Sequence, residues 1–589
     1  MKTIKNNLRM IGYIYKVAPM YLISMFLCSI IQALLAVGGL WADKEVISRL
    51  MDGRGIVTGL FLFYGFYIVL DYVFEQVRNL MMNRFNSLHN VDFSIYMRRL
   101  LYNKVKDFDI SCYEDQEFYN NYERVVGEID TRPIQVANTF SRCVYYILTM
   151  VFITVVVFEP VFIVLAFVVV IKHVLHINYL NKINYHMKME TTVHERRSGY
   201  VKQLFQDNVF IAQSRVMGAT SYFIRLNDRA VESDYIVAEK YYKKSLFSSV
   251  MSSFTGCLAP AVVGYYLCVQ MLRDRYSVSD FVYLFEAFSM FANNLTYLFQ
   301  VIPEVADHSR YIDNIWKVMD YQPVIREDGE EMASMGAFEK LEIRNLCFAY
   351  QKGREVLKGI TFQLRKGEKI AIVGENGSGK STLVKLLLDM YPAGGGEILY
   401  NGVDYRHCAA SEIRAGFGVV FQNFQTYAFT VAENVLMRNV ETEADREKVV
   451  SALGFAGLWE KVEALEDGIF TVLTRESDEN GVYFSGGEYQ KLAIARAYAR
   501  DAEVLIFDEP NSALDPVSEY EIFQKIMLLG KDRTVIYISH RLFSTVSADC
   551  IYLLADGQVC EKGTHDSLME QKGKYHDMYT AQIKGYRES

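Results

Sequence analysis

The sequence has neither the excess of positive charge nor the cysteine spacing typical of nucleic-acid-binding and zinc-binding proteins. Its formal net charge is −8, whereas proteins that bind phosphate backbones carry basic surfaces. Its nine cysteines, scattered from Cys28 to Cys560, include no Cys-x-x-Cys pair. This pattern favours free thiols in a reducing compartment over a disulfide framework or a zinc site. We therefore expect no nucleic-acid partner.

The N-terminal segment lacks acidic residues, since none precedes Asp43. An apolar run over 21–40 follows a basic start and is not followed by a small-residue cleavage site, which favours an uncleaved membrane span over a signal peptide. Because cytoplasmic flanks of membrane spans carry the excess of Lys and Arg, the N-terminus is predicted to be cytoplasmic. The basic residues are Lys2, Lys5, Arg9 and Lys16.

The bulk composition indicates a chain that is partly membrane-embedded and partly soluble. At 589 residues it exceeds the size of one hydrophobic core, and it is 51% hydrophobic and 22% charged. About 20 mostly apolar residues span a membrane, and six segments approach that length. These segments cover approximately 20–41, 56–77, 134–158, 160–179, 246–272 and 278–302.

The connections between these segments alternate between short and long. The long ones, 78–133 and 180–245, are polar and compatible with helices. An even number of spans returns the chain to the cytoplasm, where an acidic stretch leads onward. We predict a six-helix transmembrane domain with long cytoplasmic extensions over 1–325, a linker over 326–337 and a second domain over 338–589. In the second domain, short β-rich runs alternate with helical patterns, which predicts an α/β fold.

The strongest motif, 374–381, reads Gly-Glu-Asn-Gly-Ser-Gly-Lys-Ser and fits G-x-x-x-x-G-K-[ST] at every fixed position. It follows a buried strand pattern and opens an apolar helix, as a phosphate-binding loop does. Lys380 is predicted to reach the β- and γ-phosphates, and Ser381 to ligate Mg²⁺. The predicted nucleotide-binding residues of this loop are Gly374, Asn376, Gly377, Ser378, Gly379, Lys380, Ser381 and Thr382.

Two carboxylates follow a second buried strand pattern at 504–507. Ligands of open parallel sheets bind beyond the carboxyl ends of the strands, so Asp508 and Glu509 are predicted to lie at the nucleotide. Asp508 suits Mg²⁺, and Glu509 suits polarising the attacking water. The pair is a weak signal alone and a strong one after a phosphate loop in the same domain.

Phe484-Ser485-Gly486-Gly487-Glu488 resembles the signature motif of ATP-binding cassette (ABC) proteins, and six spans before one cassette resemble the half-transporter layout of ABC exporters. The resemblance covers nearly the whole chain. It implies an α-helical six-span transmembrane domain joined to an α/β P-loop NTPase domain, with ATP hydrolysis coupled to transport. ATP and Mg²⁺ are the implied cofactors.

The resemblance also implies roles for residues that would carry little meaning alone. Tyr350 lies where the family stacks a ring on adenine, Gln422 where it has the Q-loop that contacts Mg²⁺, and Asp515 in a segment similar to the D-loop. His540 resembles the switch histidine that steadies the γ-phosphate. In the family, the signature residues contact the nucleotide held by a partner cassette. Those residues here are Ser485, Gly486 and Gly487.

A dimer is therefore implied, with a homodimer favoured and a heterodimer open, because symmetric dimers are the commonest oligomers. Both Glu509 and His540 are present, unlike in a degenerate partner of an asymmetric pair. The signature departs from the usual pattern, with Phe484 in place of Leu and Glu488 in place of Gln. The segment 474–481 only loosely resembles the X-loop of exporters, so an altered turnover stays open.

Two polar stretches resemble coupling helices of bacterial exporters, namely 113–119 and 210–223. Glu286 lies within the last apolar segment, and ionisable groups inside membrane spans are costly and commonly functional, which makes Glu286 a candidate substrate residue. A plain helix–helix contact is the equal alternative. His173 and His176 lie three residues apart, but no further ligand completes a metal site.

The predicted function is ATP-driven export of a peptide or a lipophilic substrate by a dimer with alternating access. Peptide is slightly favoured, because the coupling segment resembles that of lantibiotic-type exporters. The alternatives are an importer built on an exporter fold, as in some siderophore uptake systems, and an ATP-regulated channel. The predicted location is the plasma membrane, in contact with membrane lipids, with the N-terminus and the cassette in the cytoplasm.

Overall fold

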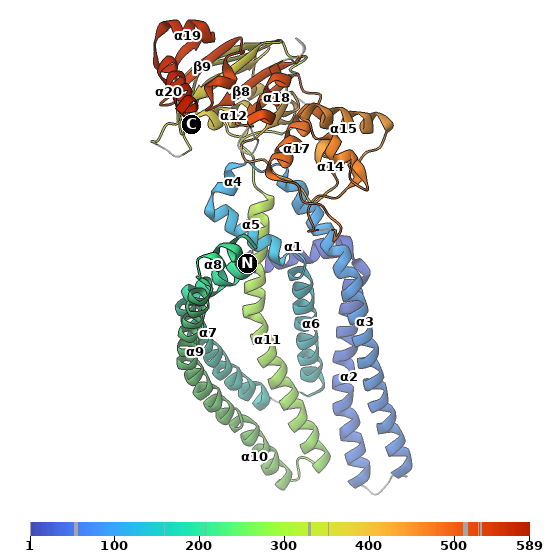
Figure 1. The fold of residues 1–589 in the computed structure, drawn as a ribbon. Coiled ribbons are helices and arrows are strands. Elements are labelled where there is room, and N and C mark those ends of the chain that lie inside the picture. The colour runs from blue at the N-terminus through green and yellow to red at the C-terminus, as the bar shows by residue number, and fades with distance from the viewer. Residues whose placement is uncertain are drawn as a thin grey trace. The chain divides into compact units, whose positions relative to one another are not determined.

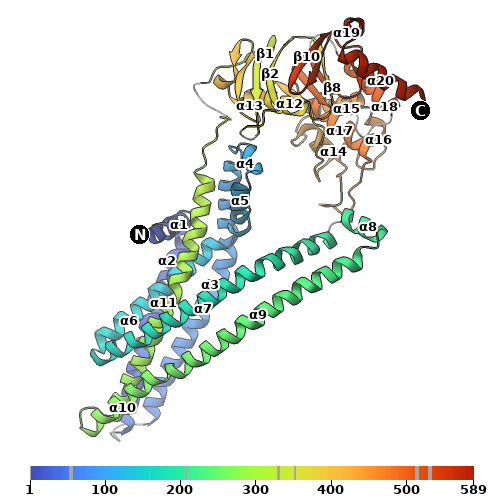
Figure 2. The same ribbon diagram turned by 90° about the vertical axis from the view of Figure 1, so that its left-hand side faces the viewer.

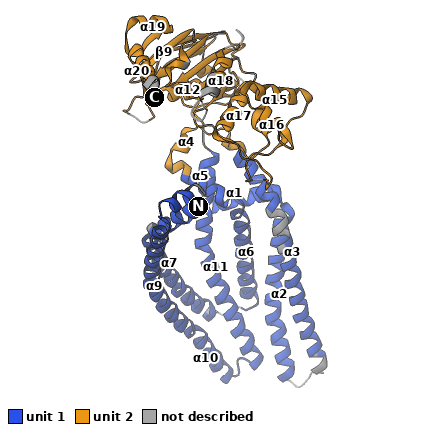
Figure 3. Cartoon of the chain, viewed as in Figure 1, with its two compact units in different colours: residues 1–102, 120–320 blue, residues 103–119, 321–589 orange. Residues whose placement is uncertain are grey.

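The computed structural model describes residues 2–51, 57–157, 160–206, 208–327, 332–350, 353–476, 478–510, 516–527, 529 and 533–588. The chain forms two compact units (Figure 3). Unit 1 contains Met1–Tyr102 and Asn120–Asp320, and unit 2 contains Asn103–Tyr119 and Tyr321–Ser589. The predicted domain boundaries, with a linker over 326–337, stay a prediction.

Unit 1 is built from long helices (Figure 1). Two of them, α3 and α5, have one end in unit 2. The helices are α1 (Lys2–Val17), α2 (Pro19–Met51), α3 (Val57–Val105), α5 (Gln116–Glu128), α6 (Arg132–Val156), α7 (Pro160–Gln206), α8 (Asn208–Val216), α9 (Thr220–Gly256), α10 (Leu258–Leu272) and α11 (Val278–Met319).

The last long helix, α11, is central to unit 1, where it packs against α1, α2, α6, α7 and α10. A capping box starts it, because Ser277 and Asp280 each accept the other's backbone N–H. Ala287 and Phe288 of this helix are buried among apolar side chains from α2, α6, α7 and α10. Helices α7 and α9 run side by side, as both views show (Figure 2).

Four helical segments among the described residues are long and apolar enough to cross a membrane: Pro19–Met51, Arg132–Val156, Val161–Thr192 and Thr220–Leu272. They correspond to four of the six predicted spans. The other two predicted spans are also helical, in α3 and α11. Asp71 and Glu75 in α3, and Asp280 and Glu286 in α11, lower the hydropathy of those segments. The number of spans therefore stays a prediction.

Unit 2 contains two sheets. An antiparallel sheet has the order β2-β1-β4-β5, and a larger sheet has the order β10-β9-β3-β8-β7-β6, in which every pair except β10 with β9 is parallel. The strands are β1 (Lys340–Phe348), β2 (Leu357–Arg365), β3 (Lys369–Gly374), β4 (Gly395–Tyr400), β5 (Val403–Asp404), β6 (Phe417–Val420), β7 (Val504–Asp508), β8 (Thr534–Ser539), β9 (Cys550–Ala555) and β10 (Gln558–Gly563).

The helices of unit 2 complete the α/β fold that the alternating pattern predicts. The core joins the two sheets through Leu341 and Ile360 of the antiparallel sheet and Ile372 and Ile506 of the parallel one. The helices are α4 (Ser111–Glu114), α12 (Lys380–Leu387), α13 (Ala410–Ala415), α14 (Val431–Leu436), α15 (Glu443–Ala456), α16 (Trp459–Glu463), α17 (Gly486–Ala499), α18 (Pro516–Met527), α19 (His565–Gln571) and α20 (Lys574–Glu588).

Candidate functional site

Three neighbouring parallel strands carry the predicted catalytic groups at their carboxyl ends. The order β3-β8-β7 places the phosphate loop, His540 and the Asp508–Glu509 pair at one edge of the sheet. The register aligns Val373 with Ser539, and Asp508 with Ile538. Elements that are far apart in the sequence therefore meet where ligands of open α/β sheets bind.

The phosphate loop joins β3 to α12 in a conformation that requires glycine. Gly377 and Gly379 have φ values of 80° and 104°, in the left-handed region that side chains disfavour. A Cβ on Gly379 would lie 2.5 Å from Cδ2 of Leu357. The loop opens directly into the N-terminus of α12, where backbone N–H groups and the helix dipole stabilise an anion.

Lys380 is buried at the first position of α12. Its Nζ donates to the carbonyl oxygens of Gly374 and Glu375, at 2.9 and 3.0 Å, and lies 3.9 Å from Oε1 of Glu509. Burial lowers the pKa of Lys380, and the charges of Glu509 and Asp508 oppose that effect. The predicted phosphate-binding lysine is thus held over the loop and faces both carboxylates.

The two carboxylates at the end of β7 lie in different environments. Asp508 is buried, and desolvation, followed by the charge of Glu509, raises the pKa of Asp508 to about 6. Glu509 has a φ of 50°, a conformation uncommon outside glycine and characteristic of functional sites. The backbone bends at Glu509, directly after the end of β7.

Gln422 and His540 meet at the carboxylate of Glu509. Nε2 of Gln422 donates to Oε2 of Glu509 at 2.8 Å, and Nδ1 of His540 lies 3.5 Å from the same oxygen. His540 is half-exposed, and its carbonyl accepts a hydrogen bond from Gln582 at 2.6 Å. The structure thus brings the three predicted catalytic residues together around one carboxylate.

Two buried polar atoms at this site have no hydrogen-bond partner within the described part of the chain: Oδ1 of Asp508 and Oγ of Ser378. Most buried polar atoms in proteins are paired, so both atoms are available to bind a ligand at this site. The side chain of Ser381 lies beside that of Asp508, and a hydroxyl beside a carboxylate supplies the oxygen ligands that Mg²⁺ prefers. The residues therefore fit Mg²⁺ at Asp508 and Ser381, and a phosphate at Ser378.

Tyr350 lies beside the phosphate loop, with 41% of its surface exposed. Its hydroxyl lies 3.2 Å from Oγ1 of Thr382 in α12. Its ring meets the rings of Phe348 and Tyr391 edge-on. An exposed aromatic ring fixed next to a phosphate loop is placed to stack on a base.

Ser485 is the N-cap of α17, and Glu488 completes a capping box with it. Oε2 of Glu488 accepts the N–H of Ser485 at 2.8 Å. Although desolvation opposes ionisation, these hydrogen bonds and the nearby charge of Lys461 hold the pKa of Glu488 below its usual value. Among the described contacts, no hydrogen bond or ion pair joins Ser485, Gly486 or Gly487 to the phosphate loop of the same chain.

One contact of the site has no signal in the sequence. Gln490 of α17 is buried and donates a hydrogen bond from Nε2 to the carbonyl of Pro510, directly after Glu509. It fixes the start of α17 relative to the carboxylates. Glutamine at this helix position is ordinary in sequence terms, and only the packing shows its partner. The predicted D-loop residue Asp515 lies outside the described residues.

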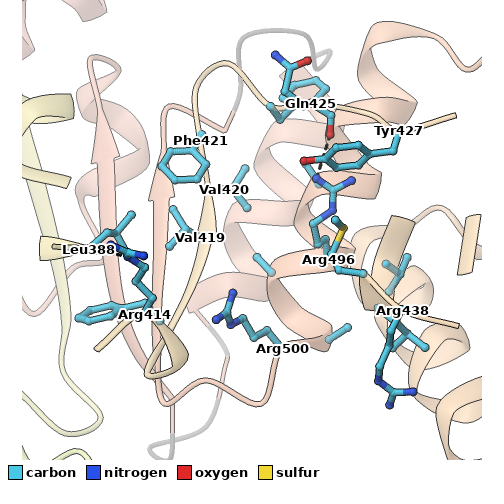
Figure 4. Close-up of a pocket in the computed structure, with 18 of the residues that line it drawn as sticks. Leu388, Arg414, Val419, Val420, Phe421, Gln425, Tyr427, Arg438, Arg496 and Arg500 are labelled. Carbon is cyan, nitrogen blue, oxygen red and sulfur yellow. Dashed lines mark hydrogen bonds between the residues drawn. The ribbon is translucent and has the colours of Figure 1, made fainter. Parts of the chain in front are cut away.

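A cavity of about 630 Å³ adjoins the segment that carries Gln422 (Figure 4). Val419, Val420 and Phe421 form part of its lining. Arg496 lies over the ring of Tyr427, 5.3 Å from its centroid, and donates to the carbonyl of Gln425 at 3.0 Å. The segment that carries Gln422 therefore connects the carboxylate of Glu509 to the wall of this cavity.

In unit 1, the structure gives Glu286 a partner. Its carboxyl group lies close to that of Asp43 in α2, and Asp43 also lies close to Tyr64 in α3. Nδ1 of His176 lies 3.0 Å from Oγ of Ser248. His173 instead lies 3.0 Å from Nε2 of Gln300. The two histidines thus contact different helices, α9 and α11, and no cluster of metal-ligating side chains occurs among the described residues.

Comparison with known proteins identifies the cassette. Residues 357–512 match the family model "ABC transporter". The ATP-dependent lipid A-core flippase of Haemophilus influenzae is 35% identical over 53% of this chain, a segment that spans 52% of that protein's length. Residues 357–512 of this chain therefore form an ABC transporter domain.

Other relatives match over nearly the whole length of this chain. The subtilin transport ATP-binding protein of Bacillus subtilis is 24% identical over 93% of this chain and 90% of its own. The nisin transport ATP-binding protein of Lactococcus lactis subsp. lactis is 24% identical over 96% and 94%. A bacterial Atm1-family ABC exporter with ATP bound has the same fold, with a TM-score of 0.81 and 21% identity over 96% of this chain and 99% of the other.

These comparisons confirm the predicted resemblance to ABC exporters and the predicted fold class, and they support ATP binding by the cassette. Together with the apolar helices, they make the chain a multi-pass membrane protein. The roles of the individual site residues stay predictions, although the structure gathers most of them at one edge of the sheet.

Proposed function

We propose that the chain is one half of an ATP-driven exporter that works as a dimer with alternating access. The observation that carries this proposal is the arrangement around Glu509. Lys380, Gln422 and His540 all face its carboxylate. Lys380 belongs to a phosphate loop that matches the motif at every fixed position. A binding module without turnover would not need this convergence.

In hydrolysis, each group of the site would have a separate task. Lys380 would bind the β- and γ-phosphates, Glu509 would orient the attacking water, and His540 would hold the γ-phosphate. Gln422 keeps Glu509 in place through its 2.8 Å hydrogen bond. Bound at Asp508, Ser381 and Gln422, Mg²⁺ would neutralise charge that develops on the phosphates.

The signature residues supply the argument for a dimer. Ser485, Gly486 and Gly487 begin α17, and a helix N-terminus binds anions. Because no described contact brings them to the phosphate loop of their own chain, a second cassette is the natural source of the phosphate that they bind. We propose a homodimer, since Glu509 and His540 make both sites of such a dimer complete.

Replacement of the catalytic carboxylate tests the proposal. Glu509→Gln should bind ATP with nearly unchanged affinity while hydrolysis falls by at least about 100-fold, the size typical of losing a general base. The matched control is Glu466→Gln, which changes an exposed carboxylate of the same cassette and should keep normal turnover. Hydrolysis at the normal rate in Glu509→Gln would refute the assignment.

The direction of transport needs its own experiment. ATP-dependent accumulation of a substrate inside inside-out vesicles indicates export, and ATP-dependent loss from preloaded vesicles indicates import. Flux down a gradient that needs ATP but no turnover, observed in Glu509→Gln, indicates a channel. We expect export, because the curated relatives named above are transporters of subtilin and nisin and a lipid flippase.

The lining of unit 1 favours a polar substrate such as a peptide. Two cavities of about 540 and 380 Å³ share Asn138 and Arg142. Amide, hydroxyl and guanidinium groups are part of their lining. Such groups can form hydrogen bonds with a peptide, whereas an acyl chain offers them no hydrogen-bond partner. Besides the shared pair, the polar lining consists of Ser29, Gln32, Arg78, Asn79, Ser141, Tyr145 and Tyr146 in the smaller cavity and Arg132, Gln135, Thr139, Glu304, Asp307 and His308 in the larger.

ATPase stimulation in nanodiscs separates the two substrate classes. Peptides should stimulate hydrolysis by the reconstituted protein, and lipids or lipophilic drugs should not. Glu286 is not among the residues that line these two cavities. Glu286→Gln should therefore leave peptide stimulation unchanged if its contact with Asp43 serves only helix packing, and should abolish it if Glu286 binds substrate.

For the location, we propose the plasma membrane with the N-terminus and the cassette in the cytoplasm. The basic N-terminal residues support this orientation, as does the need of the cassette for cytoplasmic ATP.

A further inference from the structure

Helix α4 lies in unit 2, together with the cassette (Figure 3). It begins at Ser111 and ends at Glu114, and its last two residues belong to the segment 113–119 that resembles a coupling helix. The hydroxyl of Tyr391 donates a hydrogen bond of 2.5 Å to Oε1 of Glu114. Tyr391 follows α12, the helix that starts with Lys380, Ser381 and Thr382. Glu114 of α4 thus contacts a residue that lies shortly after the helix that begins in the phosphate loop.

Tyr391 also contacts the predicted base-stacking residue. The ring centroids of Tyr391 and Tyr350 are 5.3 Å apart at an interplanar angle of 85°, an edge-to-face contact. Nζ of Lys385 lies over both rings, 5.3 Å from the centroid of Tyr350 and 5.4 Å from that of Tyr391. A cation shared by two rings holds them in a fixed relation.

The contacts that begin at Glu114 end at Tyr350 and Thr382. Its hydroxyl lies 3.2 Å from Oγ1 of Thr382. A continuous set of contacts therefore runs from Glu114 through Tyr391 to Tyr350 and Thr382. It consists of two hydrogen bonds and one ring contact, and every member lies within unit 2.

The bond between Tyr391 and Glu114 is suited to transmit a displacement. Tyr391 is only 5% exposed, and burial together with the bond to Glu114 raises the pKa of its hydroxyl well above the usual value. The hydroxyl therefore stays protonated and remains a donor. A bond to a charged acceptor is short and directional, so a shift of the Tyr391 ring is passed to the carboxylate.

We propose that Tyr391 and Glu114 are positioning residues that link the orientation of Tyr350 to helix α4. This inference rests on the proposed function, because it takes Tyr350 as the residue that stacks on adenine. When a base binds to Tyr350, the ring is fixed, Tyr391 is held against it, and Glu114 is held by Tyr391. Nucleotide binding then orders α4, and by reciprocity the position of α4 affects the affinity for nucleotide.

The test uses the full-length protein in nanodiscs with the Glu509→Gln background, so that bound ATP is not hydrolysed. Hydrogen exchange of the peptide that covers 111–119 is measured with and without MgATP, and the affinity for ATP is measured in parallel. In the parent, MgATP should slow this exchange by about fivefold, the lower end of typical coupling between sites.

Tyr391→Phe removes the hydroxyl and keeps the ring that packs on Tyr350. The slowing by MgATP should fall below about twofold, since the link is broken, while the affinity for ATP changes by less than about fivefold. Tyr119→Phe is the matched control, because Tyr119 is an exposed tyrosine of the same peptide, and it should behave as the parent.

Replacements at Glu114 test the acceptor of the hydrogen bond from Tyr391. Glu114→Gln retains an acceptor for Tyr391 and should preserve much of the slowing, whereas Glu114→Ala should lose it. The double variant Tyr391→Phe/Glu114→Ala should lose no more than either single one, as expected for two partners of one interaction. A strictly additive loss would contradict the link.

Two results overturn the inference and are distinguishable. Normal ATP binding with undiminished slowing in Tyr391→Phe shows that α4 responds by another route, and the proposed function stands. Absence of ATP binding in the Glu509→Gln parent removes the proposed function and the inference with it.

Discussion

At the scale of single residues, Glu488 shows how a departure from a family pattern is accommodated. Its carboxylate accepts the N–H of Ser485 and completes a capping box on α17. A glutamine at this position keeps the same acceptor oxygen, so the change from the usual residue preserves the cap. The altered signature is thus structurally complete.

This geometry gives the first prediction. Glu488→Ala should lower the stability of the cassette by about 1 kcal/mol, the usual cost of losing a helix cap. Glu488→Gln should cost much less. Thermal unfolding of the purified protein measures both. Equal losses in the two variants would show that the charge of Glu488, through its pair with Lys461, matters more than the cap.

Asp389 gives a prediction about pH. Desolvation raises the pKa of Asp389 to about 6, with Glu327 and Asp109 adding to the effect and Arg414 opposing it. In the unfolded chain the pKa of aspartate is about 3.9, so the folded state binds more protons between pH 4 and 6. The free energy of unfolding therefore falls as pH rises through this window. Above the window, the folded state bears the full cost of burying the ionised Asp389 carboxylate.

Asp389→Asn should remove that cost. It should stabilise the protein by about 2 kcal/mol at pH 7.5 and by about half as much at pH 5, where the wild-type carboxyl is largely protonated. Asparagine tolerates the positive φ of 48° at this position. Unfolding temperatures at the two pH values provide the measurement. Asp577→Asn, at an exposed site, serves as control, and a gain independent of pH would contradict the explanation.

At the scale of elements, Asp109 joins the chain after α11 to the end of α3. Its carboxylate accepts the N–H groups of Val324 and Ile325, at 2.9 and 3.1 Å, and the hydroxyl of Tyr321. The rings of Phe108, Phe118 and Tyr321 pack together beside it. These contacts hold residues 103–119 in the same unit as the cassette.

Asp109→Asn should break this junction. An amide offers one acceptor oxygen and places an N–H₂ group against backbone donors, which costs about 2 kcal/mol for a lost bond to a charged acceptor. Tyr321→Phe removes one of the three donors and should cost less. Thermal unfolding and protease sensitivity of the segment 321–327 would report the change. Equal stability of Asp109→Asn and wild type would show that the rings alone hold the segment.

The sequence predicted elements well where a local pattern determines them. Apolar runs located the long helices, and the strand–loop–helix pattern located Lys380 and its neighbours. The sequence did not predict the contacts of Asp109, Gln490 or Tyr391, because each residue contacts a partner that only the tertiary fold brings near. Similarly, the two histidines at 173 and 176 suggested a common face, whereas packing against α11 and α9 separates their partners.

At the scale of the whole molecule, the central question is whether each ATP site is shared between two chains. The phosphate loop and the signature residues lie on separate elements, α12 and α17, without a described contact between them in one chain. Each chain would then contribute one half of two identical sites, as the symmetry of an isologous dimer requires.

Complementation between inactive variants tests this directly. Lys380→Ala removes the ammonium that is proposed to bind phosphate. Gly486→Asp keeps α17, since an acidic residue suits the first helical turn, but repels phosphate. Each variant alone should be inactive. In a mixed dimer, one site combines both defects and the other has an intact loop and an intact signature. An equal mixture allowed to exchange subunits should therefore recover up to about a quarter of wild-type ATPase activity. If both halves of a site belonged to one chain, every mixture would stay inactive.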